Sequence, residues 1–179
     1  MSSVVPEGWI TQTVGESIEH FQNGYAFSSS GYEESGVPII SIVNISLDGN
    51  FKFDVTKEKK WSSSDLDKLH RYQVKNNDLI IAMTDVTPTM AMIGRGAVVN
   101  RKTISLLNQR VGLLKPKDSV LSKYLAYVFN GDRWRKSAQL SASLGAQANL
   151  GTADILKMNV LLPPLPEQKK IASILTSVD

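Results

Sequence analysis

Three prolines fall within four residues near the C-terminal end of the chain, in the segment Leu161-Leu162-Pro163-Pro164-Leu165-Pro166. Proline lacks a backbone N–H and restricts the residue before it, so this segment cannot be helical throughout. A helix can still begin at its end, because Pro166 suits a first helical position and Glu167 suits the positive end of a helix dipole. The segment therefore predicts a domain over residues 1–162, a hinge at 163–166 and a helix over 167–179.

The predicted C-terminal helix carries an apolar stripe. Its members are spaced i, i+3, i+4 and i+7, which also fits the first heptad of a coiled coil: Ile171, Ile174, Leu175 and Val178. A helix this short is marginal in isolation, so the stripe must pack against the domain or against a partner. A terminal helix docked on its own domain and the root of a long connecting helix both fit the pattern. The rigid prolines before it favour the second.

Upstream of the prolines, short runs of β-branched residues bounded by turn residues predict strands. The clearest are 39–45, closed by Asp48-Gly49, and 79–83, which follows Asn76-Asn77-Asp78. A third apolar segment, 90–99, is interrupted by two glycines around Arg95, which predicts a tight hairpin or a bulge. Further strands are expected at 105–107, 110–114 and 158–162.

Helical signals are fewer than strand signals. Thr13 and Glu16 form a capping box, and the apolar spacing after it predicts a helix that Asn23-Gly24 ends. Further helical pieces are expected near 62–69, over 121–129 and over 132–140. Loops rather than crossover helices separate several of the strands. The expected fold class is therefore α+β, with a β-rich mixed or antiparallel sheet, a few helices and a coiled-coil-type helix at the C-terminal end.

Composition excludes several classes of function. The 179 residues contain no cysteine, which removes thiol nucleophiles, iron–sulfur clusters and cysteine-based zinc sites. A formal net charge of +3 permits a nucleic-acid partner without demanding one. The first residues have neither the basic nor the apolar region of a secretion signal, and no stretch approaches the ~20 apolar residues of a membrane span. A cytoplasmic protein without a membrane partner is expected.

The proline junction also carries a family resemblance. Pro164-Leu165-Pro166-Glu167-Gln168-Lys169-Lys170-Ile171-Ala172, followed by Ile174-Leu175 and Val178-Asp179, resembles the junction between a target recognition domain and a long helix in the specificity subunit of type I restriction–modification systems. Weaker features of that family occur upstream in the same order: Gly8-Trp9, Gly36-Val37-Pro38-Ile39-Ile40, residues 77–84, Asn108-Gln109-Arg110 and residues 145–150.

The resemblance implies a non-catalytic reader of double-stranded DNA. A subunit of that family carries two recognition domains, each reading half of a split site. Its helices pair antiparallel, set the spacing of the halves and dock the methyltransferase subunits. This chain has room for one recognition domain, so a second domain or self-association through the C-terminal helix is expected to complete it. S-adenosylmethionine, ATP and Mg are expected on methyltransferase and restriction subunits, and no cofactor or metal on this chain.

Two sets of candidate DNA contacts follow from the chemistry of the duplex. Lysine and arginine bind phosphates without reading sequence, and the candidates are Lys57, Lys59, Lys60, Arg101, Lys102, Arg133 and Arg135. Side chains that pair donors and acceptors read base edges in the major groove, and the candidates are Gln147, Asn149, Thr84, Thr87 and Arg95. The alternatives are ordinary solvated lysines, a turn role for Arg95, and a loop-capping role for Gln147 and Asn149.

Three other functions compete with DNA reading, and histidine-based catalysis has little support. For an adenine methyltransferase, Leu162-Pro163-Pro164-Leu165 has two prolines but lacks the polar and aromatic residues that hold the target base. For a nuclease, Glu58-Lys59-Lys60 and Glu167-Gln168-Lys169 match a tripeptide that is common by chance. His20 and His70 lie in no recognisable motif and are expected at the surface. A protein-interaction module, with incidental basicity, remains the third alternative.

Overall fold

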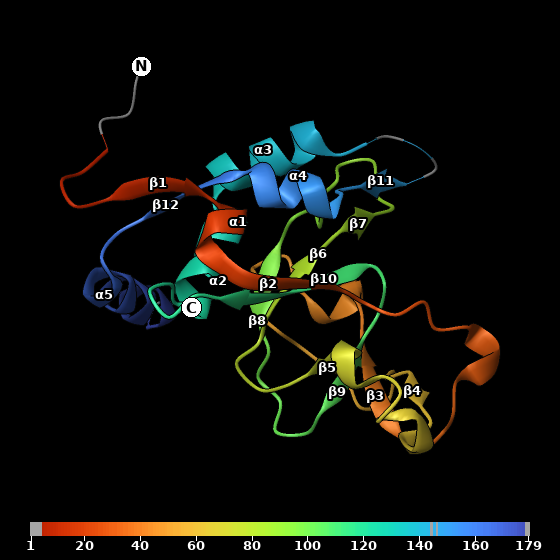
Figure 1. Ribbon diagram of the computed structural model, residues 1–179. Helices are drawn as coiled ribbons and strands as arrows, with labels where there is room; N and C mark the ends of the chain where they lie inside the picture. Colours follow the sequence, from red (N-terminus) through yellow and green to blue (C-terminus); the bar gives the residue numbers. More distant parts are fainter. Residues whose placement is uncertain (1–4, 144, 146, 178–179) are drawn as a thin grey trace.

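The computed structural model describes residues 5–143, 145 and 147–177. Its centre is a four-stranded antiparallel sheet in the order β2–β10–β6–β8 (Figure 1), formed by Ile18–Asn23, Val111–Pro116, Leu79–Ala82 and Gly96–Val98. The side chains of strand β6 alternate between the two faces of the sheet. Leu79 and Ile81 join one hydrophobic cluster, and Ile80 and Ala82 join the other. A strand that is apolar on both faces must lie inside the molecule, and all four residues are fully buried.

Helices cover one face of this sheet: α2 (Ser122–Asn130), α3 (Asp132–Ser141) and α4 (Thr152–Lys157). Tyr124, Leu125 and Phe129 of α2 join the cluster beneath them, as do Trp134 and Ala138 of α3. The contact between α2 and β8 is close, since a Cβ on Gly96 would lie 2.8 Å from the Phe129 ring. The sheet and these helices form the larger hydrophobic core.

A second sheet lies on the other side and has the order β4–β3–β9–β5, formed by Lys60–Trp61, Val37–Ile40, Ser105–Leu107 and Gln73–Val74. It is mixed, because β3 and β9 run parallel while β4 and β5 pair antiparallel with their neighbours. Ile40 and Leu107 pack with the far face of the central sheet. The fold is therefore α+β, as the sequence predicts.

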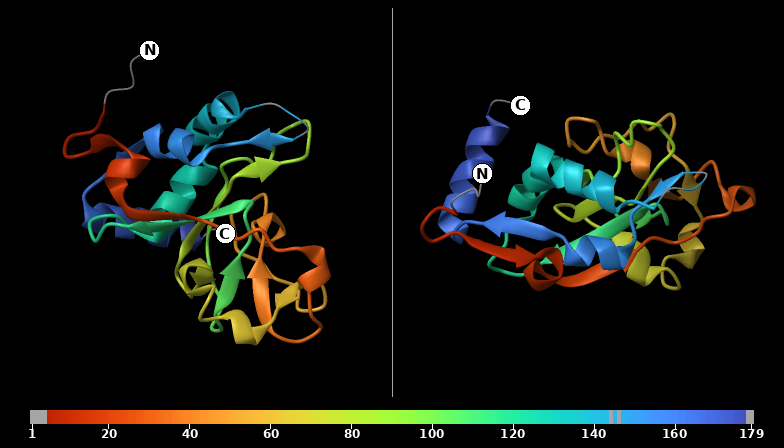
Figure 2. Two further views of the ribbon diagram at one scale, coloured as in Figure 1. Left: turned by 45° about the vertical axis from the view of Figure 1, so that its right-hand side comes forward. Right: turned by 90° about the horizontal axis from the view of Figure 1, so that it is seen from above.

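Two short antiparallel pairs extend the fold at opposite ends. At one end β1 (Ile10–Thr13) pairs with β12 (Asn159–Leu162) near helix α5, which spans Leu165–Thr176. At the other end β7 (Thr84–Asp85) pairs with β11 (Ala148–Asn149). Figure 2 shows α5 beside α2 on one side and the β7 and β11 loops on the opposite side. The chain thus has a helical end and a loop-bearing end.

Several predicted helices and strands are shorter in the structure or are replaced by turns and loops. The Thr13–Glu16 capping box is present, but helix α1 covers only Val14–Ser17 before the chain becomes strand β2. Pairing with β10 outweighs the apolar spacing that suggested a longer helix. Strand β3 ends at Ile40, where the Asn44 side chain accepts the Ser41 N–H at 2.8 Å and caps a 3₁₀ turn. Only short 3₁₀ turns occur at 62–69, and 90–93 is a loop.

Helix α5 begins at Leu165, two residues before the predicted start, and docks on the domain. The buried Gln168 amide accepts the Leu121 N–H at 2.8 Å and donates to the Ser119 and Pro163 carbonyls. Ile171 packs against the core, Leu175 is half-buried and Ile174 is 54% exposed. Val178 lies outside the described residues. The first turns of α5 are therefore fixed on the domain, while part of the predicted stripe faces solvent.

Candidate nucleic-acid interface

Two loops project side by side from the β7–β11 pair (Figure 1). The β7 loop, residues 86–92, follows Asp85, and the β11 loop, of which residues 142, 143, 145 and 147 are described, precedes Ala148. Reciprocal backbone hydrogen bonds of 2.8 and 3.0 Å between Ser143 and Asn149 close the second loop. The pairing of β7 with β11 therefore brings together segments about 60 residues apart in the sequence.

Two of the predicted base readers, Thr87 and Gln147, lie on these loops, Asn149 lies in the adjoining strand β11, and Thr84 lies behind them. Thr87 is exposed at the start of the β7 loop. Gln147 and Asn149 are half-buried, and the Asn149 amide donates to the Gln147 carbonyl at 3.0 Å. Thr84 is 7% exposed, and its hydroxyl has no hydrogen-bond partner among the described residues. Thr84 therefore lies beneath the surface that Thr87 helps to form.

Arg95 supports the β7 loop instead of projecting from it. Its Nε donates to the Ala91 carbonyl at 2.7 Å and its Nη1 to the Asn130 side chain at 3.2 Å. Burial lowers the pKa of Arg95, and the negative charge of Asp48 partly opposes that effect. This geometry matches the turn role that the flanking glycines left open for Arg95.

The predicted phosphate contacts of residues 57–60, here called the lysine loop, are exposed or half-buried. Lys57 forms an exposed ion pair with Asp54 at 3.5 Å, and Lys59 lies 5.8 Å from the Tyr32 ring centroid. Lys60 donates to the Glu34 carbonyl at 3.0 Å. Lys102 and Arg133, on other segments, are exposed. These five side chains remain accessible to an anionic partner.

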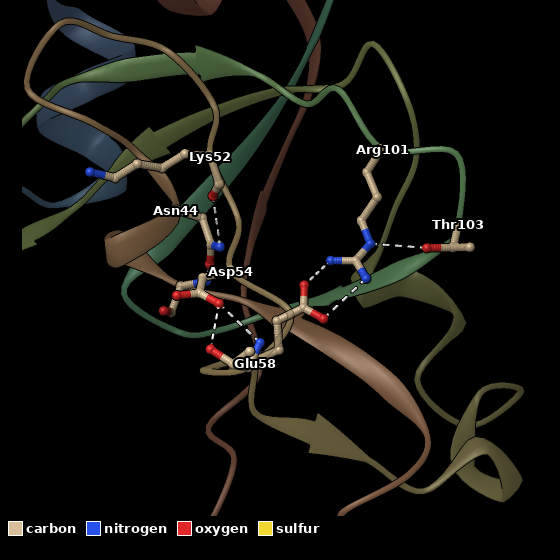
Figure 3. Close-up of polar contacts among 8 residues, drawn as sticks. Asn44, Lys52, Asp54, Glu58, Arg101 and Thr103 are labelled. Carbon is tan, nitrogen blue, oxygen red and sulfur yellow. Dashed lines mark hydrogen bonds and ion pairs between the residues drawn. The ribbon is translucent and has the colours of Figure 1, made fainter.

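Arg101 is already occupied by a carboxylate (Figure 3). Its guanidinium makes a two-point ion pair with Glu58, donates to the Thr103 hydroxyl at 2.9 Å and lies 4.5 Å from the Phe53 ring centroid. The side chains of Arg101 and Glu58 are only 12% and 6% exposed. Arg101 therefore braces the loop that carries the lysines, and it presents little of its charge to solvent.

Arg135 is likewise turned inward, although it was predicted as a phosphate contact. It is 7% exposed on α3, and its Nη2 donates to the carbonyls of Met90 and Ala91, both at 2.8 Å. Burial lowers the pKa of Arg135 to about 10, and the positive charge of Arg95 contributes to the shift. The guanidinium stays charged at neutral pH and holds the β7 loop from behind.

Sequence reasoning missed three polar residues of this region. Asp85 is 2% exposed, and its carboxylate accepts the Thr87 N–H at 2.7 Å and the Met92 N–H at 2.5 Å. Gln139 of α3 donates to the Thr89 carbonyl at 3.2 Å. Lys52 is exposed beside the lysine loop, and Figure 3 shows it directed away from Asp54 and Glu58. An aspartate two residues before a threonine is a turn signal that could have indicated Asp85.

A cleft of about 650 Å³ lies beside the lysine loop. Its lining includes two aromatic rings, Tyr32 and Phe53, and the exposed Val43. Three lysines and two carboxylates also line it: Lys52, Lys57, Lys59, Asp54 and Glu58. The two rings suit a flat or apolar group. The cleft and the paired loops are separate features of the surface.

The carboxylates of the nuclease-like tripeptides are engaged elsewhere. Glu58 is paired with Arg101, and Glu167 accepts the Trp9 indole N–H at 3.2 Å. The described part of the chain contains no group of three or more metal-binding side chains placed to hold an ion. Within those same residues, no helix has the length and apolar character needed to span a membrane.

Comparison with curated proteins finds relatives over nearly the whole chain. The putative type I restriction enzyme MjaX specificity subunit of Methanocaldococcus jannaschii is 25% identical over 178 residues, 98% of this chain and 40% of that protein. The type I restriction enzyme EcoKI specificity subunit of Escherichia coli is also 25% identical, over 97% of this chain and 37% of that protein. The chain thus spans about two fifths of the length of these relatives.

Solved structures share the fold over the same extent. The HsdS subunit of Thermoanaerobacter tengcongensis matches 99% of this chain with a TM-score of 0.67 and 21% identity, over 39% of its own length. A chain from a structural study of type I R-M complex assembly and conformational transition matches 99% with a TM-score of 0.70 and 20% identity, over 40% of its length. These likenesses concern the backbone fold.

A sequence model of one family covers almost all of the chain. It is described as the type I restriction modification DNA specificity domain, and it matches residues 6–179. The match includes the β7–β11 loops, the lysine loop and the proline junction with α5. This chain therefore belongs to the type I restriction modification DNA specificity domain family.

Proposed function

We propose that this chain binds duplex DNA and selects one half of a split target site. The observation that carries the proposal is the family match over residues 6–179, on a fold whose loop-bearing end presents hydroxyl and amide side chains. Thr87, Thr89 and Gln147 offer the donors and acceptors that base edges require. The exposed Val86 offers an apolar contact for a thymine methyl group.

Phosphate contacts in this proposal come from the accessible cations around the loops. On α3, Arg133 and Lys136 are exposed on the helix whose other face holds the β7 loop. Lys102 and the lysines at 52, 57, 59 and 60 form a second group. The formal net charge of the chain is only +3, so we expect the phosphate contacts to give modest affinity. Sequence preference would then come from the loops.

Partners are proposed at the opposite end of the molecule. The α5 helix continues the apolar spacing of a coiled coil, and Ile174 is exposed on it. We place there a second recognition domain or a second copy of the chain, together with methyltransferase and restriction subunits that hold S-adenosylmethionine, ATP and Mg. Because α5 lies far from the paired loops (Figure 2), assembly through it leaves those loops free for DNA. Methyl transfer and cleavage, in the cytoplasm, would belong to those subunits.

Titration of the purified chain against duplex DNA at two salt concentrations tests the proposal. A DNA reader with a handful of phosphate contacts should bind at low salt, and its affinity should fall steeply as salt rises. Absence of binding at low salt would favour a protein-interaction module instead. Methyl transfer or strand cleavage by the purified chain would contradict the assignment of bond-making to other subunits.

A further inference from the structure

The β7 loop lacks regular secondary structure, yet most of its residues have a hydrogen-bonded backbone N–H or carbonyl group. Asp85 closes the loop by accepting N–H groups near both its ends, Thr87 and Met92. Donors from outside the loop bind three successive carbonyls: Gln139 binds Thr89, Arg135 binds Met90, and both Arg135 and Arg95 bind Ala91. Met90 is held at a φ of +49°, which a non-glycine residue adopts only when its surroundings enforce it.

Helix α3 supplies most of this support from one face. Trp134 donates its indole N–H to the Gly94 carbonyl at 2.8 Å, two residues after the end of the loop. Gly94 has a φ of +71°, and a Cβ there would lie 2.6 Å from the Ala138 side chain. Arg135 and Gln139 extend the same contact onto the loop itself. The loop is therefore clamped between α3, Arg95 and the Asp85 carboxylate.

Arg135 is poorly suited to act simply as a stabilising residue. Its Nη1 is buried and has no hydrogen-bond partner among the described residues, which is unfavourable for a charged group. Replacing a buried ion pair with well-packed apolar residues of similar volume is often neutral or stabilising, because it removes the cost of desolvating charge. The same desolvation cost applies to the buried guanidinium of Arg135. What the guanidinium adds, and an apolar residue cannot add, is a fixed position for the Met90 and Ala91 carbonyls.

We propose that Arg135, together with Arg95, Gln139 and Asp85, positions the β7 loop so that Val86, Thr87 and Thr89 meet base edges in one geometry. This inference rests on the proposed DNA-reading function and deepens it. It makes Arg135 a positioning residue for sequence selection, in place of the phosphate contact that its charge suggests. A loop held before binding loses less conformational freedom on binding, and its contacts discriminate more sharply between bases.

Two substitutions at one position separate the possible roles of Arg135. In Arg135→Met the Met90 carbonyl keeps the Gln139 donor and the Ala91 carbonyl keeps the Arg95 donor, so neither is orphaned. In Arg135→Lys a single ammonium can reproduce both bonds, since one nitrogen, Nη2, makes both of them in the wild-type chain. The lysine variant should therefore rescue what the methionine variant loses.

The experiment selects sites from a pool of randomised duplex DNA with the full chain that contains this domain. The wild type should enrich a defined sequence, Arg135→Met should lower that enrichment by about tenfold or more, and Arg135→Lys should retain most of it. The thermal unfolding midpoint of Arg135→Met should not fall, whereas amide hydrogen exchange at Met90 and Met92 should accelerate. The slope of log affinity against log salt should stay at its wild-type value.

Three outcomes would overturn the inference. If the methionine variant enriches the same sequence as the wild type, Arg135 does not position the reading loop. If its salt slope falls by about one while its site preference is kept, Arg135 contacts a phosphate. If the wild type itself enriches no sequence, the proposed function fails and the inference fails with it.

Gln139→Ala provides a milder variant should Arg135→Met fail to fold. Gln139 is half-buried on α3, and alanine is a better helix former at that position. The variant removes the donor to the Thr89 carbonyl and should broaden the enriched sequence without changing the salt slope. An unchanged enriched sequence would count against the clamp as the source of selectivity.

Discussion

At the scale of single residues, this chain uses similar arginines for different purposes. Arg133 is exposed and free to meet an anion, whereas Arg101 and Arg135 point inward and bind protein oxygens. Each inward arginine lies behind a candidate DNA-contacting segment, Arg101 behind the lysine loop and Arg135 behind the β7 loop. Sequence alone nominates all of them for phosphate contact, because charge is visible in a sequence and burial is not.

The Arg101–Glu58 pair should stabilise the fold far more than an exposed pair does. Glu58→Gln would leave the guanidinium largely buried beside a neutral group, and we expect the free energy of unfolding to fall by about 2–3 kcal/mol. Lys57→Ala is the matched control, since its ion pair with Asp54 is exposed and should contribute less than about 1 kcal/mol. Urea denaturation of both variants measures the difference. Equal losses would show that burial of the pair is unimportant.

The Gln147 and Asn149 side chains should decide which sequence is modified. They are proposed to read base edges from the β11 loop, so the double variant Gln147→Ala/Asn149→Ala should relax or abolish site preference while the fold is kept. The measurement is the DNA sequence that the assembled complex modifies. Modification of the same sequence at the same rate would remove this loop from the reading surface.

At the scale of elements, the sequence predicts the strongly patterned pieces and misses those that depend on distant partners. The α2 helix and strand β6 lie where their apolar periodicity places them. The sequence predicts helix over strand β2, because the capping box of α1 precedes it and its apolar spacing is helical. Its pairing with β10 shows otherwise. The clamp on the β7 loop was also missed, since Arg95, Arg135 and Gln139 meet it through contacts with no local sequence signal.

The β7 loop should loosen in acid. Burial raises the pKa of Asp85, but hydrogen bonds from the Thr87 and Met92 N–H groups outweigh that effect and leave the pKa below its ordinary value. The contribution of Asp85 is therefore complete above about pH 4, the unfolded value, and is lost as pH falls through the lower folded value. Asp85→Asn should flatten this acid dependence in hydrogen exchange of the loop amides. An unchanged acid profile in that variant would contradict the role of Asp85.

The junction between the domain and α5 should depend on Gln168. Its buried amide binds the Leu121 N–H and the Ser119 and Pro163 carbonyls, so Gln168→Ala would leave three backbone groups without that partner. We expect the free energy of unfolding to fall by about 2–3 kcal/mol. Lys169→Ala, at the next and exposed position, should change it by less than about 0.5 kcal/mol. Similar effects of the two variants would mean that α5 is not locked by this amide.

At the scale of the whole molecule, the proposed DNA contacts and the proposed partner contacts lie at opposite ends. The β7 and β11 loops lie at one end, and α5 with its exposed Ile174 lies at the other, so DNA and partner subunits need not compete for surface (Figure 2). The core between them is continuous from β12 to α3, which holds the two ends in a fixed relation. This arrangement suits a subunit that chooses where on a duplex a larger assembly is placed.

Methylome sequencing of cells that differ only in the gene for the full chain tests this choice of sequence most directly. One split motif should be methylated when the gene is present and should lose its methylation when the gene is deleted. If every methylated motif persists unchanged after deletion, the chain does not determine the target.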